Sequence, residues 1–163
     1  MWLNMRNKKI YLTALTILII DIISKLVVSN LMLENQSIRI IDNLFYITYV
    51  RNTGVAFSLL EGNVFLIVIM TLIVIVLLVK YINSKCFNLV ESIIYGFVVG
   101  GAIGNLIDRI FYGYVIDFFD VYIFGYDFPI FNVADIAIVL GIMFLLIINI
   151  KEEFGDKYGI NSR

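Results

Sequence analysis

The sequence predicts an all-α membrane protein with four transmembrane helices, which carries a small hairpin or curled sheet and an aromatic segment on one face. Hydrophobic residues make up 61% of the chain and charged residues only 15%, whereas soluble domains average about 45 to 50% and about 25%. The mean hydropathy is +0.97. The apolar residues form four long runs, and two of the connecting segments are far too long to be simple turns.

The four apolar runs each approach the roughly 20 residues that a helix needs to cross the hydrocarbon core of a bilayer. We predict spans at Ile10 to Ser29, Val64 to Tyr81, Asn88 to Ile107 and Val133 to Ile150. The first run follows basic residues, as a secretory signal does, but no small-x-small cleavage site follows it. We therefore expect it to stay as an anchor, within a single integral membrane domain over residues 1–163.

The basic residues predict the orientation of the chain, because cytoplasmic loops carry an excess of Lys and Arg. One side of the predicted membrane holds Arg6, Lys8, Lys9, Lys80, Lys85, Lys151, Lys157 and Arg163. The other side holds Arg39, Arg51 and Arg109. Both termini are therefore expected in the cytoplasm. The net charge of −1 gives no bulk attraction to nucleic acid, and no nucleic-acid partner is expected.

Two extracytoplasmic segments, Asn30 to Asn63 and Asp108 to Asn132, are expected to carry the function. The first contains a β-branched and aromatic run at Leu44 to Val50, a turn signal around Gly54, and a second apolar run at Val55 to Leu60. This pattern predicts a small hairpin or curled sheet. The second segment is rich in Phe and Tyr, which favour the headgroup level, and is expected to be an interfacial loop or short helix.

The composition excludes several classes of site. The chain has no His and a single cysteine, Cys86, so no intrachain disulfide can form. A Cys-His nucleophile or a zinc site is not expected. We predict neither a metal nor a cofactor.

Charged residues inside the first span need a partner or a function, because lipid excludes them. Asp21 precedes Ser24 and Lys25 by three and four residues, which places all three side chains on one helical face. We interpret Asp21 and Lys25 as a structural ion pair that fixes helix packing.

The third span carries a stripe of small residues and then a polar end. Gly96, Gly100 and Gly104 recur at four-residue spacing, which lets helices approach closely in lipid. Asn105 and Asp108 follow on a shared face at the outer boundary, next to Arg109. Two roles stay open for Arg109, which are anchoring at the headgroups and orienting catalytic carboxylates.

Two further carboxylates are expected at the same outer boundary. Asp117 lies in an apolar and aromatic run, and Asp135 lies one turn into the fourth span, where capping of the helix is an alternative role. Two carboxylates brought together in a low dielectric share a proton. One can then activate water while the other polarises an amide carbonyl, which is aspartyl-protease chemistry without His, Cys or metal.

These residues resemble the lipoprotein signal peptidase (signal peptidase II) family over nearly the whole chain. The matching motifs occur in the family's order and are DxxSK at 21–25, RNTGVAFS at 51–58, GGAIGNLIDR at 100–109, VIDF at 115–118 and FNVAD at 131–135. One position departs slightly, since Val55 stands where many relatives have a smaller residue. The resemblance implies four transmembrane helices, a small extracytoplasmic β-cradle and an interfacial helix or loop over the site.

The resemblance also implies an activity and a site. Asp117 and Asp135 would be the catalytic dyad, supported by Asn52, Asn105, Arg109 and Asn132. The expected substrate is a diacylglyceryl-modified bacterial prolipoprotein, cut before its lipidated cysteine. The enzyme is expected in the bacterial plasma (inner) membrane, in contact with lipid and as a monomer, with its active site at the extracytoplasmic face.

Two other functions compete with this one. The first is a Ser-Lys peptidase that uses Ser58 or Ser24 with Lys25 as the base, although Asp21 would hold that lysine charged. The second is a small non-enzymatic transporter or channel subunit with Asp21 and Asp108 on an ion path. The inverted repeat that such transporters often have is not visible in the sequence.

Overall fold

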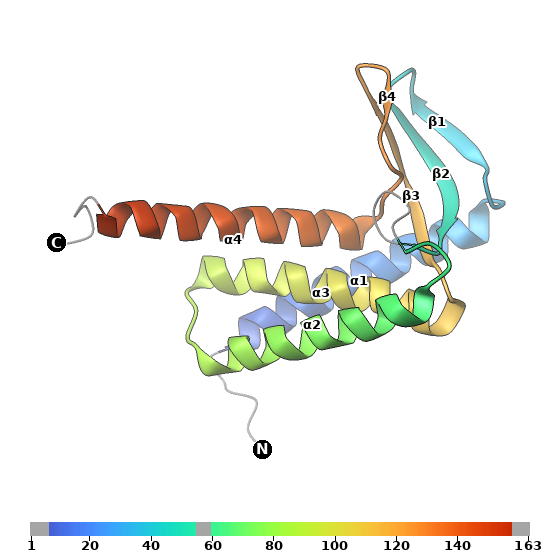
Figure 1. The fold of residues 1–163 in the computed structure, drawn as a ribbon. Coiled ribbons are helices and arrows are strands. Elements are labelled where there is room, and N and C mark those ends of the chain that lie inside the picture. The colour runs from blue at the N-terminus through green and yellow to red at the C-terminus, as the bar shows by residue number, and fades with distance from the viewer. Residues whose placement is uncertain (1–6, 55–59, 158–163) are drawn as a thin grey trace.

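The computed structural model describes residues 7–54 and 60–157, which form four helices and four strands (Figure 1). In chain order the elements are α1 (Lys8–Leu31), β1 (Ser37–Ile41), β2 (Phe45–Asn52), α2 (Val64–Ser84), α3 (Leu89–Tyr112), β3 (Val115–Ile123), β4 (Tyr126–Asp127) and α4 (Val133–Lys157). The helices run alongside one another, and the sheet lies at one end of them (Figure 1).

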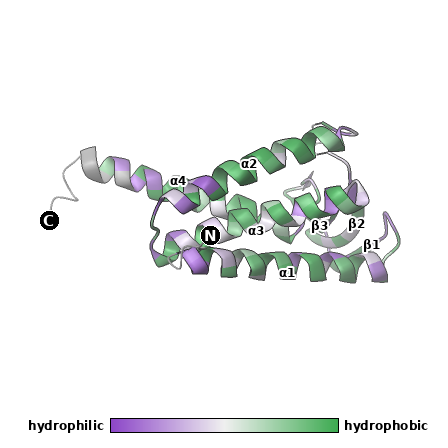
Figure 2. Ribbon diagram, turned by 90° about the horizontal axis from the view of Figure 1, so that it is seen from below, coloured by the Kyte–Doolittle hydropathy of each residue, from purple (hydrophilic) through white to green (hydrophobic). Residues whose placement is uncertain are grey.

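Each of the four helices is long and apolar enough to cross a membrane. Their large apolar side chains are mostly exposed, as in α2, where Phe65 is 78% exposed. Hydrophobic residues predominate along α1 and α2 (Figure 2). An apolar surface of this extent needs lipid and not water around it. The predicted four-span architecture is thus confirmed.

Helix α3 packs against α1 and α4 through its glycines. A Cβ added at Gly100 would lie 2.6 Å from the carbonyl oxygen of Ala14 in α1, and one added at Gly104 would lie 2.5 Å from Asp21 Oδ2. Gly101 faces the backbone of Ala134 in α4. The small-residue stripe therefore brings three helix backbones close together, as the spacing predicted.

Helix α3 continues five residues beyond its predicted end at Ile107. It ends at Gly113, whose backbone is left-handed with φ 77° and whose N–H donates to the Arg109 carbonyl. Asp108 and Arg109 therefore lie within the helix and point from its last turns. At the other end, Asn88 and Glu91 form a capping box.

The strands form one antiparallel sheet in the order β1-β2-β3-β4. Tyr46 on β2 pairs with Asp120 on β3, and Val50 pairs with Asp117, with a register shift between these two positions. The sheet is fixed to the end of α1 by a cluster of Val28, Met32, Tyr49, Ile116 and Phe118. The position of Asp117 relative to the helices follows from this packing.

One detail of the outer segments differs from the prediction, and another agrees with it. The aromatic segment was expected to be a loop or short helix, but Val115–Ile123 is a strand, because its β-branched and aromatic residues find a partner in β2. The predicted small hairpin or curled sheet is present as an antiparallel sheet, in which β2 pairs with the preceding Ser37–Ile41. Of the expected second run, Val55 to Leu60, only Leu60 lies within the described residues.

Candidate active site

Asp117 lies near the start of β3 with its carboxylate almost fully enclosed by protein. Its side chain is only 2% exposed. Asn52 at the end of β2 donates to Oδ2 at 2.8 Å, and Asn132 donates to Oδ1 at 2.6 Å. Both carboxylate oxygens therefore have an amide donor, which fixes the orientation of the group.

Asp135 lies in the first turn of α4 and is held from two directions. Its Oδ2 accepts the backbone N–H of Asn132 at 3.2 Å, and its own N–H donates to Asn132 Oδ1 at 2.9 Å. This is a reciprocal cap, so the capping role expected as an alternative is present. Asn105 of α3 donates to Asp135 Oδ1 at 2.7 Å. Capping of α4 and a place in the polar site are thus compatible.

Asn132 connects the two carboxylates. It is fully buried, and while its backbone holds Asp135, its side chain Nδ2 donates to Asp117 and, at 3.2 Å, to Asn105 Oδ1. Segments that are distant in sequence therefore meet at one residue. The structure brings together Asp117, Asp135, Asn52, Asn105 and Asn132, all of which the sequence singled out.

The environment of Asp117 favours its protonated form. Burial raises the pKa of Asp117 from 3.8 to about 7, and the neighbouring Asp135 carboxylate adds to this effect. The amides of Asn52 and Asn132 act in the opposite direction, because they donate to the ionised form. A proton therefore remains with this pair of carboxylates up to about neutral pH.

A buried ionic cluster lies directly beneath the pair. Lys25 Nζ is 2.7 Å from Asp21 Oδ2 and 2.9 Å from Asp108 Oδ2, and it donates to Asn105 Oδ1 at 3.1 Å. The predicted ion pair of Asp21 with Lys25 is therefore confirmed, with Asp108 as a second anion. The Lys25 amine is therefore occupied by two carboxylates and one amide oxygen.

The same cluster holds the elements that carry the two acids. Asp21 Oδ1 accepts the backbone N–H of Ala134 at 2.9 Å, next to Asp135 in α4. Asp108 Oδ2 accepts the backbone N–H of Ile116 at 3.3 Å, next to Asp117 in β3. The positions of both acids are consequently linked to α1 and α3.

Arg109 has backbone partners. Its guanidinium donates to the Gly54 carbonyl at 2.6 Å and to the Asn105 carbonyl at 3.4 Å. Arg109 therefore holds the segment after β2 against α3. Its sequence position did not predict this contact with the Gly54 carbonyl. Arg109 still lines the same cavity as Asp117 and Asp135.

A cavity of about 1020 Å³ opens beside the two acids. Its polar end contains Asn52, Asn105, Arg109, Asp117 and Asp135, and the rest of its wall is mainly apolar, with Ala102, Phe131, Ile138, Val139 and Leu140. An elongated apolar ligand with one polar bond at the carboxylates would match this lining.

The Ser-Lys alternative does not match the geometry at Ser24. The Ser24 hydroxyl donates to the Asp21 carbonyl at 2.8 Å, while Lys25 is occupied by the two carboxylates and Asn105. Ser58, the other serine considered, lies outside the described residues.

One buried acid received no role from the sequence. Asp120 on β3 is 6% exposed, and the only local signal was a third carboxylate in an apolar run. Its burial depends on strand pairing, which the sequence did not specify.

Comparisons with known proteins identify the family. The signal peptidase (SPase) II family matches residues 13–151. The chain belongs to this family. It is 41% identical to the lipoprotein signal peptidase of Staphylococcus haemolyticus over 152 residues, which covers 90% of this chain and 96% of that protein. It is 42% identical to that of Halalkalibacterium halodurans, with 93% and 98% covered.

Solved structures agree with this membership. A bacterial membrane enzyme at 2.3 Å resolution has a TM-score of 0.81 and 36% identity, with 87% of each chain covered. A second, at 1.9 Å, has a TM-score of 0.78 and 35% identity, with 86% of this chain and 91% of that chain covered. Membership in the signal peptidase II family makes this chain an aspartic-type peptidase and decides against a transporter or channel subunit.

Proposed function

We propose that this chain is an aspartic endopeptidase that removes the signal peptide from diacylglyceryl-modified bacterial prolipoproteins, cutting before the lipidated cysteine. Asp117 and Asp135 are its catalytic dyad. The observation that carries the proposal is the pair of carboxylates joined through Asn132 at the polar end of a largely apolar cavity. The names of its relatives, lipoprotein signal peptidases, support the substrate.

The geometry supports a division of roles between the two acids. Asp117, whose pKa is raised to about 7, carries the proton and donates it to the scissile carbonyl oxygen. Asp135 lies at the N-terminus of α4 and accepts N–H groups from Asn105 and Asn132, which orient its carboxylate for the role of general base. Asp135 takes a proton from water, and the water oxygen bonds to the carbonyl carbon.

Collapse of this tetrahedral diol completes the reaction. Asp135 returns its proton to the amide nitrogen as the C–N bond breaks, and a diol hydroxyl returns a proton to Asp117. The products are the free carboxyl end of the signal peptide and the amino group of the lipidated cysteine. The dyad is then in its starting state.

The surrounding residues hold the dyad in place. The amides of Asn52, Asn105 and Asn132 orient the carboxylates. Arg109 fixes the Gly54 carbonyl at the cavity wall. The buried cluster of Asp21, Lys25 and Asp108 is structural, because it is linked to the backbone beside each acid. All these groups come from one chain, as a single domain over residues 1–163. The site needs no residue from a second copy, which supports a monomer.

The apolar wall and the position of the dyad support selection for a lipidated substrate. The acids lie where the helices meet the sheet, so the scissile bond must be held at the membrane boundary (Figure 1). Two acyl chains on the substrate cysteine would fix it there, since each buried methylene contributes about 0.8 kcal/mol to membrane association. An unlipidated precursor is expected to be a poor substrate.

The orientation is proposed from charge. Lys80, Lys85 and Lys151 lie near helix ends remote from the sheet, which supports cytoplasmic termini and an extracytoplasmic site in the plasma membrane. Cys86 is exposed between α2 and α3. A membrane-impermeant thiol reagent should label it only after permeabilisation, and efficient labelling in intact cells would reverse this orientation.

The function is tested with purified enzyme and a precursor with or without the diacylglyceryl group. Asp117→Asn and Asp135→Asn should each abolish cleavage of the lipidated precursor while leaving its binding measurable. Asp42→Asn is the matched control, because Asp42 is an acid in the turn between β1 and β2 and its side chain is 68% exposed. Cleavage by either dyad variant, or equal cleavage of both precursors by the wild type, would contradict the proposal.

A further inference from the structure

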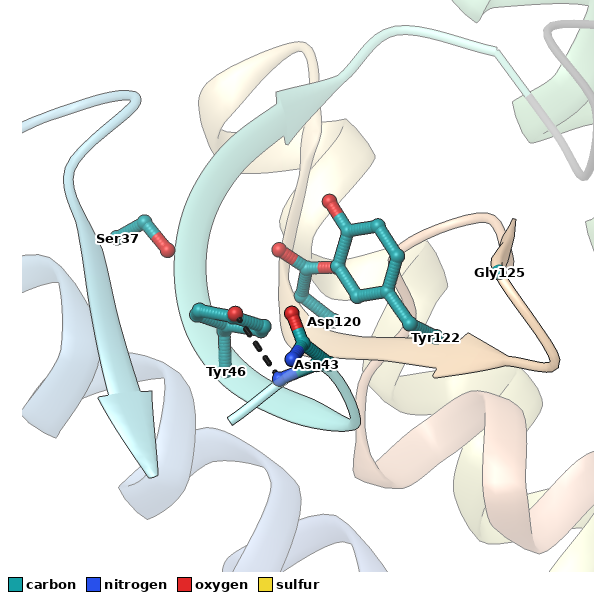
Figure 3. Close-up of a pocket in the computed structure, with 6 residues that line it drawn as sticks. All are labelled: Ser37, Asn43, Tyr46, Asp120, Tyr122 and Gly125. Carbon is teal, nitrogen blue, oxygen red and sulfur yellow. Dashed lines mark hydrogen bonds between the residues drawn. The ribbon is translucent and has the colours of Figure 1, made fainter. Parts of the chain in front are cut away.

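A second cavity, of about 410 Å³, lies on the sheet away from the dyad. Its lining comes from three strands and two turns, and consists of Ser37, Asn43, Tyr46, Asp120, Tyr122 and Gly125 (Figure 3). Asp120 is three residues beyond Asp117 on β3, and side chains alternate between the faces of a strand. The two acids therefore project to opposite faces, and this cavity is separate from the proposed active site.

The Asp120 carboxylate in this cavity is incompletely paired. Its side chain is buried, and Thr48 donates to Oδ2 at 2.5 Å. Its other oxygen, Oδ1, is buried without a hydrogen-bond partner among the described residues. Within the same part of the chain no Lys or Arg forms an ion pair with it. A buried carboxylate of this kind needs a donor, and a cationic donor matches its charge best.

Two aromatic rings pack together beside that carboxylate. Tyr46 and Tyr122 pack edge to face with ring centroids 5.5 Å apart, and both line the cavity together with Asp120 (Figure 3). Tyrosine faces attract cations, and an ammonium group combines an attraction to rings with N–H donors for a carboxylate. Arg39, which pairs with Tyr46 across the strands, is already bound to Asp42 at 2.6 Å.

The electrostatic field at the cavity is negative. Asp120 and Asp127 raise the pKa of the Tyr122 phenol, so that group stays protonated. The lining does not resemble a metal site, since the described residues contain no group of three or more His, Cys, Asp or Glu side chains placed to hold a metal. An organic cation fits one carboxylate and two phenol rings better than a divalent metal does.

The apolar tip of the sheet indicates where this cation comes from. Two lining residues, Asn43 and Gly125, directly adjoin Leu44 and Phe124, which are 47% and 107% exposed. Ile40 and Ile41 on β1 are also half exposed. Exposed apolar side chains beside tyrosines are typical of a segment that enters the lipid interface. The cavity then lies at the level of the lipid headgroups.

We propose that this cavity binds the ammonium group of an aminated phospholipid headgroup, such as that of phosphatidylethanolamine. The Asp120 carboxylate accepts a hydrogen bond from the ammonium, and Tyr46 and Tyr122 form an aromatic wall beside it. The lipid thereby fixes the free end of the sheet to the membrane surface. This inference does not depend on the catalytic roles proposed for Asp117 and Asp135.

The test uses the purified full-length protein in detergent and soluble short-chain lipids, with binding measured by isothermal titration calorimetry. Dihexanoyl phosphatidylethanolamine should bind at least about tenfold more tightly than dihexanoyl phosphatidylglycerol, which has the same chains without the ammonium group. Asp120→Asn should abolish this preference. The control Asp42→Asn removes an exposed acid from the turn between β1 and β2 and should retain the preference.

Three further arms test the aromatic wall and separate a lipid headgroup from a soluble amine. Tyr122→Leu removes one wall but keeps the carboxylate, so it should weaken the preference and provides a second test if Asp120→Asn does not fold. Free ethanolamine and a short lysine peptide should each bind more weakly than the aminated lipid. The proposal fails if the two lipids bind equally, if the folded Tyr122→Leu or Asp120→Asn variant keeps the wild-type preference, or if either soluble amine binds as tightly as the lipid.

Discussion

Replacing Asp117 with Asn should abolish cleavage and yet stabilise the folded protein at alkaline pH. Asp117 is 2% exposed, and its pKa rises from 3.8 to about 7 on folding. A carboxyl group with a raised pKa binds its proton more tightly in the folded state. It therefore destabilises the fold progressively as pH rises from 3.8 to about 7. At pH values above that range, the ionised carboxylate lowers the free energy of unfolding by about 4 kcal/mol.

The substituted amide removes this charge but loses a hydrogen bond. Asp117 accepts one N–H group at each oxygen, from Asn52 and Asn132. An asparagine has only one side-chain oxygen, so one of these buried donors would face an NH₂ group and lose its partner, at a cost of about 1 to 3 kcal/mol. The variant should therefore be more stable than the wild type by about 1 to 3 kcal/mol at pH 8. This advantage should shrink or reverse as pH falls toward 4.

The assay is unfolding of the purified protein in detergent by titration with a denaturing detergent at about pH 5 and pH 8, alongside cleavage of lipidated precursor. Asp42→Asn provides the control, because Asp42 is an exposed acid and its replacement should give nearly the same difference in stability at both pH values. If the difference between Asp117→Asn and the wild type were also the same at both, Asp117 would not bind the proton that its environment implies.

Three other substitutions test the contacts around the dyad, and a fourth serves as a control. Asn132→Ala removes both the cap of α4 and a hydrogen bond to Asp117, so it should lower the free energy of unfolding by about 2 to 4 kcal/mol. Asn88→Ala, which removes only the cap of α3, should lower it by about 1 kcal/mol in the same assay; equal losses would contradict the bridging role. Because the Asn132 bond lowers the pKa of Asp117, the alkaline limb of cleavage by Asn132→Ala should also move to higher pH in a pH-rate profile. Lys25→Met leaves Asp21 and Asp108 buried without their shared cation and should cost about 3 to 5 kcal/mol on unfolding, whereas an unchanged midpoint would show that the cluster is not structural. Gly104→Ala places a Cβ 2.5 Å from Asp21 Oδ2 and should destabilise the protein by about 1 to 3 kcal/mol by forcing α1 and α3 apart, a change that a wild-type unfolding curve would refute.

Local patterns in the sequence determined the helices and several contacts within them. Hydropathy over about 20 residues is enough to predict a span, because lipid contact acts on each helix separately. The ion pair between Asp21 and Lys25 and the cap formed by Asn132 and Asp135 are also local. Each depends on the three- or four-residue spacing of a single helix end or face.

The ends of elements and the pairing of strands depended on distant parts of the chain. Helix α3 was predicted to stop at Ile107 because hydropathy falls at Asp108, but Lys25 of α1 partners that acid and the helix continues to Tyr112. Val115–Ile123 forms a strand because β2, more than sixty residues earlier, offers it an edge. The local sequence pattern does not distinguish such a strand from an interfacial loop, because strand formation depends on a partner that lies far away in the sequence.

The sequence by itself determined four membrane spans, the order of the polar motifs and the residue types at the candidate site. Only the tertiary structure decided that Asn132 joins Asp117 to Asp135, that Lys25 serves two acids, and that Asp120 is buried in a cavity of its own. The physical reason is that the burial of a side chain, and the charges that act on it, depend on every helix and strand packed around it. The raised pKa of Asp117 depends on residues from β2, α1 and α4, whose positions near it are set by helix packing and strand pairing and not by their spacing along the chain.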